Sequence, residues 1–197
     1  MYRTEGEPLL LFHTGYAEIR KPNLRRGRKN ADFGQGFYLT PDRAFSERWG
    51  RERKGESVHV NMYRLDLSGL RVYRFAREKA WSDYIFRNRR GQPDALADQD
   101  VIIGPVANDT LFNTMGILSS GFLPPEEVLQ LLRVGPEYIQ VVIKTERAAA
   151  RLTWLETSIL NSGRVRQLGE ALAAEERAYQ EEFAGAFQAM EEETPEA

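Results

Sequence analysis

Short apolar runs alternate with polar turns along most of this chain. Apolar runs bounded by glycine, proline or serine predict strands. The predicted strands are EPLLLFHTG ending at Gly15, GFYLT closed by Pro41, SVHVNMYRLDLSG, LRVYRF, DVIIGPVAND and EYIQVVIKT, which is the last strong strand. In SVHVNMYRLDLSG the alternation of apolar and polar residues is broken once, which predicts a strand with one irregularity.

Helical spacing predicts helices between these strands. PDRAFSERWGRERKG has Pro41 at the first helical position, Asp42 in the first turn and Gly55 beyond the end. KAWSDYIFRNRRG has the apolar spacing of a helix before a glycine stop, and LPPEEVLQLLRVG predicts a shorter one. We predict helix or loop for ERAAARLTWLETSILNSG. The inward positions of KAWSDYIFRNRRG are Trp81, Tyr84, Ile85 and Asn88.

The C-terminal part, from Val165 to about Met190, is rich in Ala, Glu and Gln and predicts a surface helix. Its apolar residues recur at helical intervals, which predicts that one face of the helix packs against other residues. Packing on the body of the protein is favoured over packing on a partner. We therefore divide the chain into a domain of residues 1–160 and an acidic helical tail of residues 161–197. Strands and helices without regular alternation favour an α+β fold over a doubly wound parallel sheet. The apolar positions of the tail are Leu168, Leu172, Tyr179, Phe183, Phe187 and Met190.

The amino-acid composition limits which kinds of catalytic and binding site the protein can have. The 197 residues are 42% hydrophobic, which suits one globular domain with a core. The absence of cysteine excludes disulfides and thiol nucleophiles, and His13 and His59 alone do not suggest a metal site. The N-terminus does not resemble a signal peptide, and no apolar run approaches the roughly 20 residues of a membrane span. These features predict a cytoplasmic protein without a membrane association.

The net charge of −2 hides two regions of opposite sign. Between Arg20 and Lys54 eleven Lys or Arg face four acids, whereas between Glu170 and Ala197 nine Glu face one Arg. A basic region of this kind either attracts phosphates, of a nucleic acid or a dinucleotide, or forms a solvated surface.

Three short segments carry the candidate chemistry: FHTG, GQGFYLT and PEYIQVV. Taken singly, each of their polar residues has an ordinary structural interpretation: a strand-end histidine for His13, a packing aromatic for Tyr38 and a surface acid for Glu137. Gly34 and Gly36 either supply the positive φ angles of a tight turn or leave room for a ligand against the backbone. The order and spacing of the three segments favour a shared site.

This succession resembles the H-Y-E pattern of ADP-ribosyltransferases similar to diphtheria toxin and poly-ADP-ribose polymerases. It is still more similar to a related bacterial domain family of unknown function, often encoded beside small antitoxin-like proteins. The motifs of that resemblance lie between Leu9 and Leu152, and DFGQGFYLT is the most specific of them. The others are LFHTG, Trp81 with Asn88 and Arg89, DVIIGPVAND and QVVIKTERA.

The resemblance implies a split β-sandwich of two small packed sheets, flanking helices and an NAD cleft between the sheets. NAD would be a substrate. His13 would bind the ribose, the backbone of Thr14 or Gly15 would bind the nicotinamide amide, and Tyr38 would stack on the nicotinamide ring. The remaining residues expected to bind NAD are Gly34, Gly36, Phe37, Asn88 and Arg89.

Two residues compete for the catalytic position of the last strand. Glu137 matches the transferase pattern and is favoured, whereas the nearer family indicates Gln140. Side chains three positions apart face opposite sides of a strand, so both cannot easily enter one pocket. A glutamine can hydrogen-bond a ribose hydroxyl but cannot act as a general base. The acids that could supply a missing charge are Asp32, Asp100 and Asp109.

The resemblance therefore implies an ADP-ribosyltransferase that modifies a macromolecular target, protein or nucleic acid, as the toxin of a bacterial toxin-antitoxin pair or a related defence protein. An antitoxin protein is the implied partner. An NAD glycohydrolase and a non-catalytic module that binds a nucleotide or a partner are the alternatives. The basic segment RKPNLRRGRK, residues 20–29, is the candidate loop for recognising the target.

Overall fold

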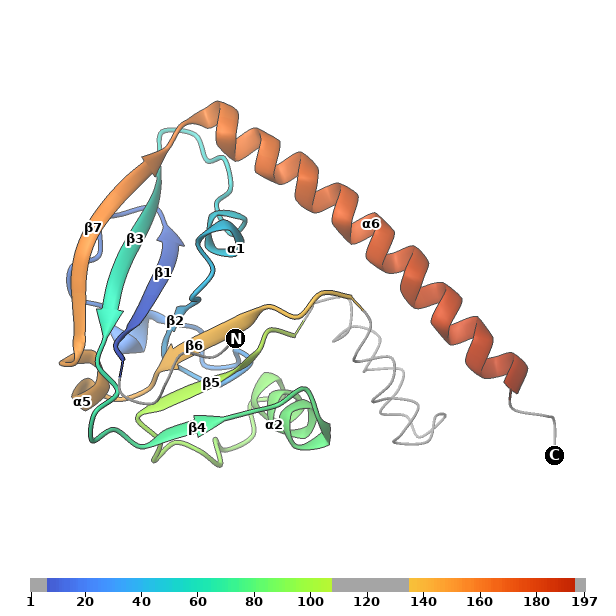
Figure 1. Ribbon diagram of the computed structural model, residues 1–197, viewed down its shortest axis with the longest axis horizontal. Coiled ribbons are helices and arrows are strands. Elements are labelled where there is room, and N and C mark those ends of the chain that lie inside the picture. Colours follow the sequence, from blue (N-terminus) through green and yellow to red (C-terminus); the bar gives the residue numbers. More distant parts are fainter. Residues whose placement is uncertain (1–6, 108–134, 194–197) are drawn as a thin grey trace.

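Two β-sheets and a long C-terminal helix make up the fold (Figure 1). The structure is a computed structural model that describes residues 7–107 and 135–193, without the side chains of residues 187 and 189–193. The elements are β1 (Leu9–Gly15), η1 (Leu24–Arg26), β2 (Phe37–Leu39), α1 (Arg43–Glu47), β3 (Val58–Leu65), β4 (Val72–Arg74), α2 (Lys79–Arg89), β5 (Val101–Pro105), β6 (Ile139–Ile143), α5 (Glu146–Ala149), β7 (Leu152–Leu160) and α6 (Ser162–Glu193). The predicted α+β class is confirmed.

The strands form a three-stranded sheet, β1-β3-β7, and a four-stranded sheet, β2-β6-β5-β4. All pairs are antiparallel except β4 with β5. The register of β3 with β7 shifts between Met62 and Tyr63, which confirms the expected irregularity. Phe12 and Thr40 exchange backbone hydrogen bonds of 2.8 and 3.0 Å, and this bridge ties β1 of one sheet to the end of β2 in the other.

Each face of the four-stranded sheet has its own core. Strand alternation turns Val141 and Ile143 toward the three-stranded sheet, and Val142 toward α2. On α2, the inward positions predicted from the sequence are all buried. The first core includes Leu11, Phe37, Tyr63, Leu65, Val101 and Ile103, and the second includes Phe33, Trp81, Tyr84, Ile85 and Ile102.

Two predicted elements differ from the structure. The helix over PDRAFSERWGRERKG has five residues, and Asp42 is its N-cap, accepting a 3.1 Å hydrogen bond from Phe45 N. After Glu47 the α-helical pattern gives way to a tighter turn, in which the amides of Arg48, Trp49 and Gly50 donate to oxygens three residues earlier. The segment expected to be helix or loop after Thr145 contains only the four-residue α5 and then the nine-residue β7. LPPEEVLQLLRVG lies outside the described residues.

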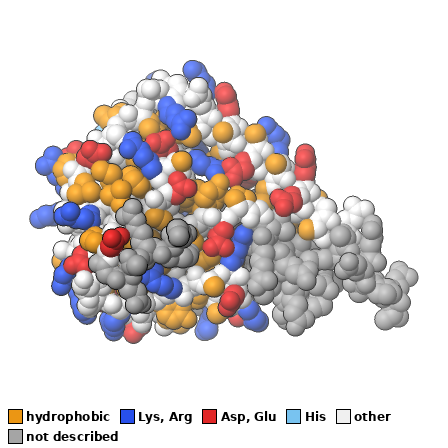
Figure 2. All heavy atoms as spheres, in the orientation of Figure 1, with side chains coloured by type: hydrophobic (Ala, Val, Ile, Leu, Met, Phe, Trp, Pro, Cys, Tyr) orange, Lys and Arg blue, Asp and Glu red, His pale blue; other side chains and the backbone are white. Residues whose placement is uncertain are grey.

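The tail is helical, as predicted, and it packs on the body. Arg164 forms an ion pair of 3.3 Å with Glu47, and Glu175 pairs with Arg48. Leu168 and Tyr179 are buried, Leu172 and Phe183 are half-buried, and the side chains of Phe187 and Met190 lie outside the described part. No helix in the described part of the chain is long and apolar enough to cross a membrane. Figure 2 shows acidic and basic side chains interspersed on one face, with basic side chains at its left margin.

Candidate functional site

The glycine turn before β2 is fastened by the side chain of Tyr38. Its hydroxyl donates to Gly34 O at 2.7 Å and accepts from Phe33 N at 2.9 Å. Burial raises the pKa of Tyr38 far above its usual value, and the nearby Asp32 charge adds to this effect. The Tyr38 hydroxyl is therefore neutral, and it both donates and accepts a hydrogen bond within the turn.

Gly34 needs to be glycine for two reasons. Its φ is +73°, and an added Cβ would lie 2.7 Å from Asp94 Oδ2 and 2.9 Å from Lys144 Nζ. Lys144 is nearly buried and ion-paired with Asp94, which also accepts a 2.6 Å hydrogen bond from Tyr84 OH. Burial acts to raise the pKa of Asp94, but the hydrogen bonds from Lys144 and Tyr84 hold it below its usual value.

Gly36 has a different role from the one expected. Its φ is not among the positive values, so the turn does not require glycine there for conformational freedom. An added Cβ would lie 2.6 Å from Ile143 O and 2.7 Å from Val142 Cγ1. Gly36 therefore allows the backbone of β2 to approach β6 closely, whereas Gly34 provides the positive φ.

Asp32 is the centre of a polar cluster between the glycine turn, α2 and β6. Its Oδ1 accepts from Arg89, with Nη2 at 2.6 Å and Nε at 2.7 Å. Its Oδ2 accepts from Gln140 Nε2 at 3.1 Å and from Ala107 N at 3.2 Å. Asn88, which is buried, donates to the backbone oxygen of Asp32 at 3.0 Å. The structure thus brings four of the sequence candidates together in one network.

His13 lies at the end of β1, beside the unpaired edge of β2. Its Nδ1 is 2.8 Å from Tyr38 O, and because a carbonyl only accepts, Nδ1 carries the proton. Burial lowers the pKa of His13, and the hydrogen bond to the carbonyl opposes that shift. Nε2 of the neutral ring is then an acceptor next to Gly15, whose added Cβ would lie 3.4 Å away.

Thr14 forms a buried hydroxyl pair that sequence reasoning did not find. Thr14 Oγ1 and Ser46 Oγ are 2.8 Å apart, and both residues are buried. The short α1, fixed by its Asp42 cap, carries Ser46 to the end of β1. The only sequence signal was the position of Ser46 in the helix that directly follows the GFYLT motif.

The predicted site residues divide into two groups. Tyr38 pairs in register with Val142, so alternation places its side chain on the same face of the sheet as Gln140. The His13 ring instead contacts Phe37, 4.4 Å between centroids, and Phe37 belongs to the core between the sheets. The convergence expected for His13, Tyr38 and the last strand is therefore only partial.

The two candidates for the catalytic position have opposite environments. Gln140 lies in β6, 3% exposed, and also donates to Pro105 O at 3.1 Å. Glu137 precedes the strand and is exposed. Between them, Tyr138 stacks on Phe45 at 4.0 Å and donates to Glu175 of α6 at 3.0 Å.

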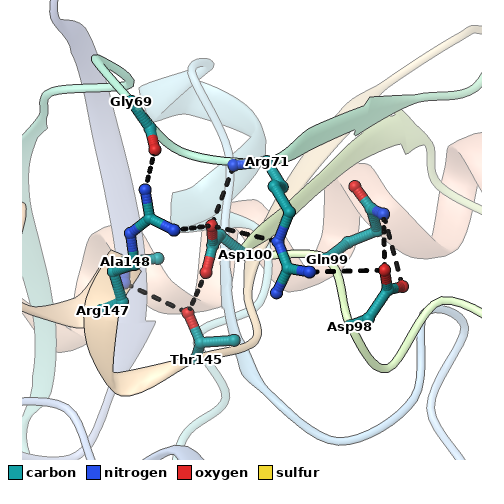
Figure 3. Close-up of polar contacts among 8 residues, drawn as sticks. All are labelled: Gly69, Arg71, Asp98, Gln99, Asp100, Thr145, Arg147 and Ala148. Carbon is teal, nitrogen blue, oxygen red and sulfur yellow. Dashed lines mark hydrogen bonds and ion pairs between the residues drawn. The ribbon is translucent and has the colours of Figure 1, made fainter.

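Asp100 has a structural role at the other end of β5 (Figure 3). It accepts from Arg71 N at 2.8 Å and from Thr145 Oγ1 at 2.7 Å, and Arg147 lies within 3.5 Å. The Arg71 amide is the main cause that holds the pKa of Asp100 below its usual value. Gln140 pairs with Gly104, four residues along β5, so the two groups are about 13 Å apart. Asp109 lies outside the described residues.

The sequence profile of a family described as a protein of unknown function (DUF3990) matches residues 9–154. This match covers well over half of the chain, and the protein therefore belongs to that family. No curated protein and no solved structure matches the chain significantly. Within the described residues, no group of three or more His, Cys, Asp or Glu side chains is placed to hold a metal ion.

Proposed function

We propose that this protein is an ADP-ribosyltransferase that cleaves NAD and transfers ADP-ribose to a macromolecule, on the split β-sandwich of those enzymes. The observation that carries the proposal is the end of β1, where His13, Thr14 and Gly15 meet Ser46 of α1. A neutral imidazole acceptor, two hydroxyls and a backbone without a side chain lie there within a few residues.

This group of atoms suits a ribose and a carboxamide. His13 Nε2 can accept a hydrogen bond from a ribose hydroxyl, because its proton is held on Nδ1 by Tyr38 O. A carboxamide needs both donors and acceptors, and the Thr14 and Ser46 hydroxyls can act as either. Ser46 has no exposed surface, so its proposed role is to hold the Thr14 hydroxyl in position for nicotinamide.

In the proposed reaction the bond between nicotinamide and ribose breaks, and an acceptor nucleophile forms a bond to the ribose and loses its proton. A carboxylate near the developing positive charge would stabilise it. Gln140 cannot supply that charge, but its amide is 3.1 Å from Asp32, which can. In this proposal Gln140 orients a ribose hydroxyl and Asp32 provides the negative charge behind it, both on the face of the sheet that holds Tyr38 and not on the face of the His13 ring.

The same cluster supports a second candidate, a module that binds NAD without cleaving it. The carboxylate of Asp32 already accepts four hydrogen bonds from groups of the protein, and the charge of Arg89 neutralises it. A carboxylate in that position is more typical of a structural anchor than of a general base. The two candidates share the nicotinamide contacts and differ only in turnover.

The test uses NAD labelled on its adenylate part, incubated with the purified protein with and without cell lysate. Label in macromolecules supports the transferase, and free ADP-ribose identifies a glycohydrolase. Ser46→Ala should weaken NAD binding about 10-fold, the effect of one lost hydrogen bond, whereas exposed Ser68→Ala should leave it unchanged. Binding without any cleavage identifies the non-catalytic module, and the absence of both binding and cleavage contradicts the proposal.

The link of the resembled family with antitoxin-like proteins extends the proposal to a toxin. Expression of the active protein in bacteria should then arrest growth, and His13→Asn should relieve the arrest. Normal growth with an active enzyme would remove the toxin from the proposal and leave the enzyme.

A further inference from the structure

The basic loop of residues 20–29 and the adjacent end of α2 form a surface whose charge is not balanced locally. We propose that this surface binds the phosphate backbone of a nucleic acid and is where the protein holds a nucleic-acid acceptor. The acceptor role rests on the proposed function, but the binding itself requires neither NAD nor catalysis.

The loop is anchored to the candidate site. Gln35, which lies between the two glycines of the turn, donates from Nε2 to Arg25 O at 2.9 Å and to Gly27 O at 3.0 Å. Gly27 also lies against Gly36, because a Cβ added at Gly27 would be 2.5 Å from the Gly36 oxygen. Asn23 caps η1 by accepting from Arg25 N at 3.0 Å. These contacts fix the loop backbone next to β2 and leave the basic side chains outside.

Five cations on this loop lack a counter-charge. They are exposed and have no hydrogen-bonded or ion-paired side-chain partner among residues 7–107 and 135–193: Lys21, Arg25, Arg26, Arg28 and Lys29. The acids closest along the chain are already engaged, Glu18 with Arg20 and Asp32 with Arg89. The positive charge of the loop cations is therefore available to an external anion.

The end of α2 extends this surface. An added Cβ at Gly91 would lie 3.7 Å from the Asn30 side chain, so the helix end and the loop are neighbours. Arg87 is exposed on the last turn of α2 and donates to Gln92 Oε1 at 3.1 Å, a neutral partner that leaves its charge uncompensated. A sixth cation is thus added from a second element.

The character of this surface favours nucleic acid over an acidic protein. Protein interfaces usually place aromatic or apolar side chains at their centre. The large hydrophobic residues exposed in the described part are Leu10, Tyr73, Leu155 and Ile159, and none belongs to the loop. A phosphate backbone needs no apolar contact, and arginine donates two parallel hydrogen bonds to a phosphate. Because the loop carries no exposed aromatic side chain to stack on bases, the binding should not depend on sequence.

The experiment measures the affinity of the full chain for fluorescently labelled 20-nucleotide single-stranded and duplex DNA, by anisotropy at several salt concentrations without NAD. If four of these cations contact phosphates, the log-log salt slope on single strands is about −3, which means roughly 50-fold weaker binding at 200 than at 50 mM salt. The variant Arg25→Gln/Arg26→Gln/Arg28→Gln should bind at least about 10-fold more weakly at 50 mM salt and reduce the slope by about 2.

The matched control removes the same charge elsewhere. Arg64→Gln/Arg74→Gln/Arg166→Gln changes three exposed arginines outside this surface and should leave the affinity within about 2-fold. Equal losses in both triple variants would mean that only net charge matters, and would overturn the proposal.

Two competitors separate other sources of anionic charge. Poly-glutamate that displaces DNA at an equal charge concentration would identify an acidic protein as the partner and overturn the proposal. NAD that displaces DNA at low millimolar concentration would mean that the loop holds the dinucleotide phosphates instead. DNA binding that survives both competitors supports the proposal, even if NAD cleavage is never detected, and absent DNA binding refutes it whatever NAD does.

Discussion

Replacing Gln140 by methionine tests which residue occupies the catalytic position of β6. Methionine keeps the length and approximate volume of the side chain but removes both hydrogen bonds, to Asp32 Oδ2 and to Pro105 O. A lost bond to a charged acceptor costs about 1.5–3 kcal/mol and one to a neutral acceptor about 1 kcal/mol. Each acceptor keeps another donor, Ala107 N or Trp81 Nε1, so we expect about 2–3 kcal/mol of lost stability.

The matched variant is Glu137→Gln. Glu137 is exposed and outside the strand, so its free energy of unfolding should change by less than about 0.5 kcal/mol. If Gln140 orients a ribose hydroxyl, Gln140→Met should also lower turnover of labelled NAD about 10- to 100-fold, whereas Glu137→Gln should retain full turnover.

Both quantities are measured on the same preparations, unfolding by urea with circular dichroism and turnover by release of labelled ADP-ribose or its transfer. Turnover is compared at a temperature where both variants are fully folded. The reasoning fails if Glu137→Gln loses about 100-fold or more in turnover at unchanged stability, because an exposed acid outside β6 would then be the catalytic group.

Three further predictions concern stability. Gly36→Val should lower the free energy of unfolding, measured in urea, by at least about 1–3 kcal/mol because the new side chain would clash with β6. The control Gly185→Ala, at an open helical site, should raise it by about 0.5–1 kcal/mol. Equal stability of Gly36→Val and the parent would contradict the packing argument. Lys144→Met should cost about 3–5 kcal/mol because it leaves Asp94 without its cation, and a loss below about 1 kcal/mol in the same assay would show that the pair is not a stabilising contact. The lowered pKa of folded His13 means that the unfolded chain binds a proton more readily as the pH falls below the ordinary value of 6.5, so stability should fall there by at most about 1.4 kcal/mol per pH unit. His13→Asn should flatten that decline, and identical pH profiles for the two proteins would refute it.

Most strands and the second helix could be predicted from the sequence because their apolar residues follow a single period. β7 was missed because its sequence, LTWLETSIL, places two adjacent apolar residues at Trp154 and Leu155, close to where the register with β3 shifts. A pattern broken in that way does not distinguish strand from helix. Pairing with β3 decided the outcome.

The polar cluster could be predicted only in part. The motifs supplied Tyr38, Gln140 and Arg89, but nothing in the sequence indicates that Arg89 pairs with Asp32, 57 positions away. The division of His13 and Tyr38 between two sides of β2 also had no local signal. It depends on the three-residue register with β6, which only the tertiary fold determines.

The order of strands in the four-stranded sheet also has a consequence during synthesis. β2 pairs with β6, Phe37 with Ile143, so about a hundred residues separate the two partners. At the usual rate of translation of about 5–20 residues per second, β2 waits roughly 5–20 s after it is made before its partner exists. β3 likewise waits for β7. This high contact order means that the four-stranded sheet cannot close before Ile143 has left the ribosome, and the three-stranded sheet not before Leu160, so β2 and β3 remain without these partners long after they are made.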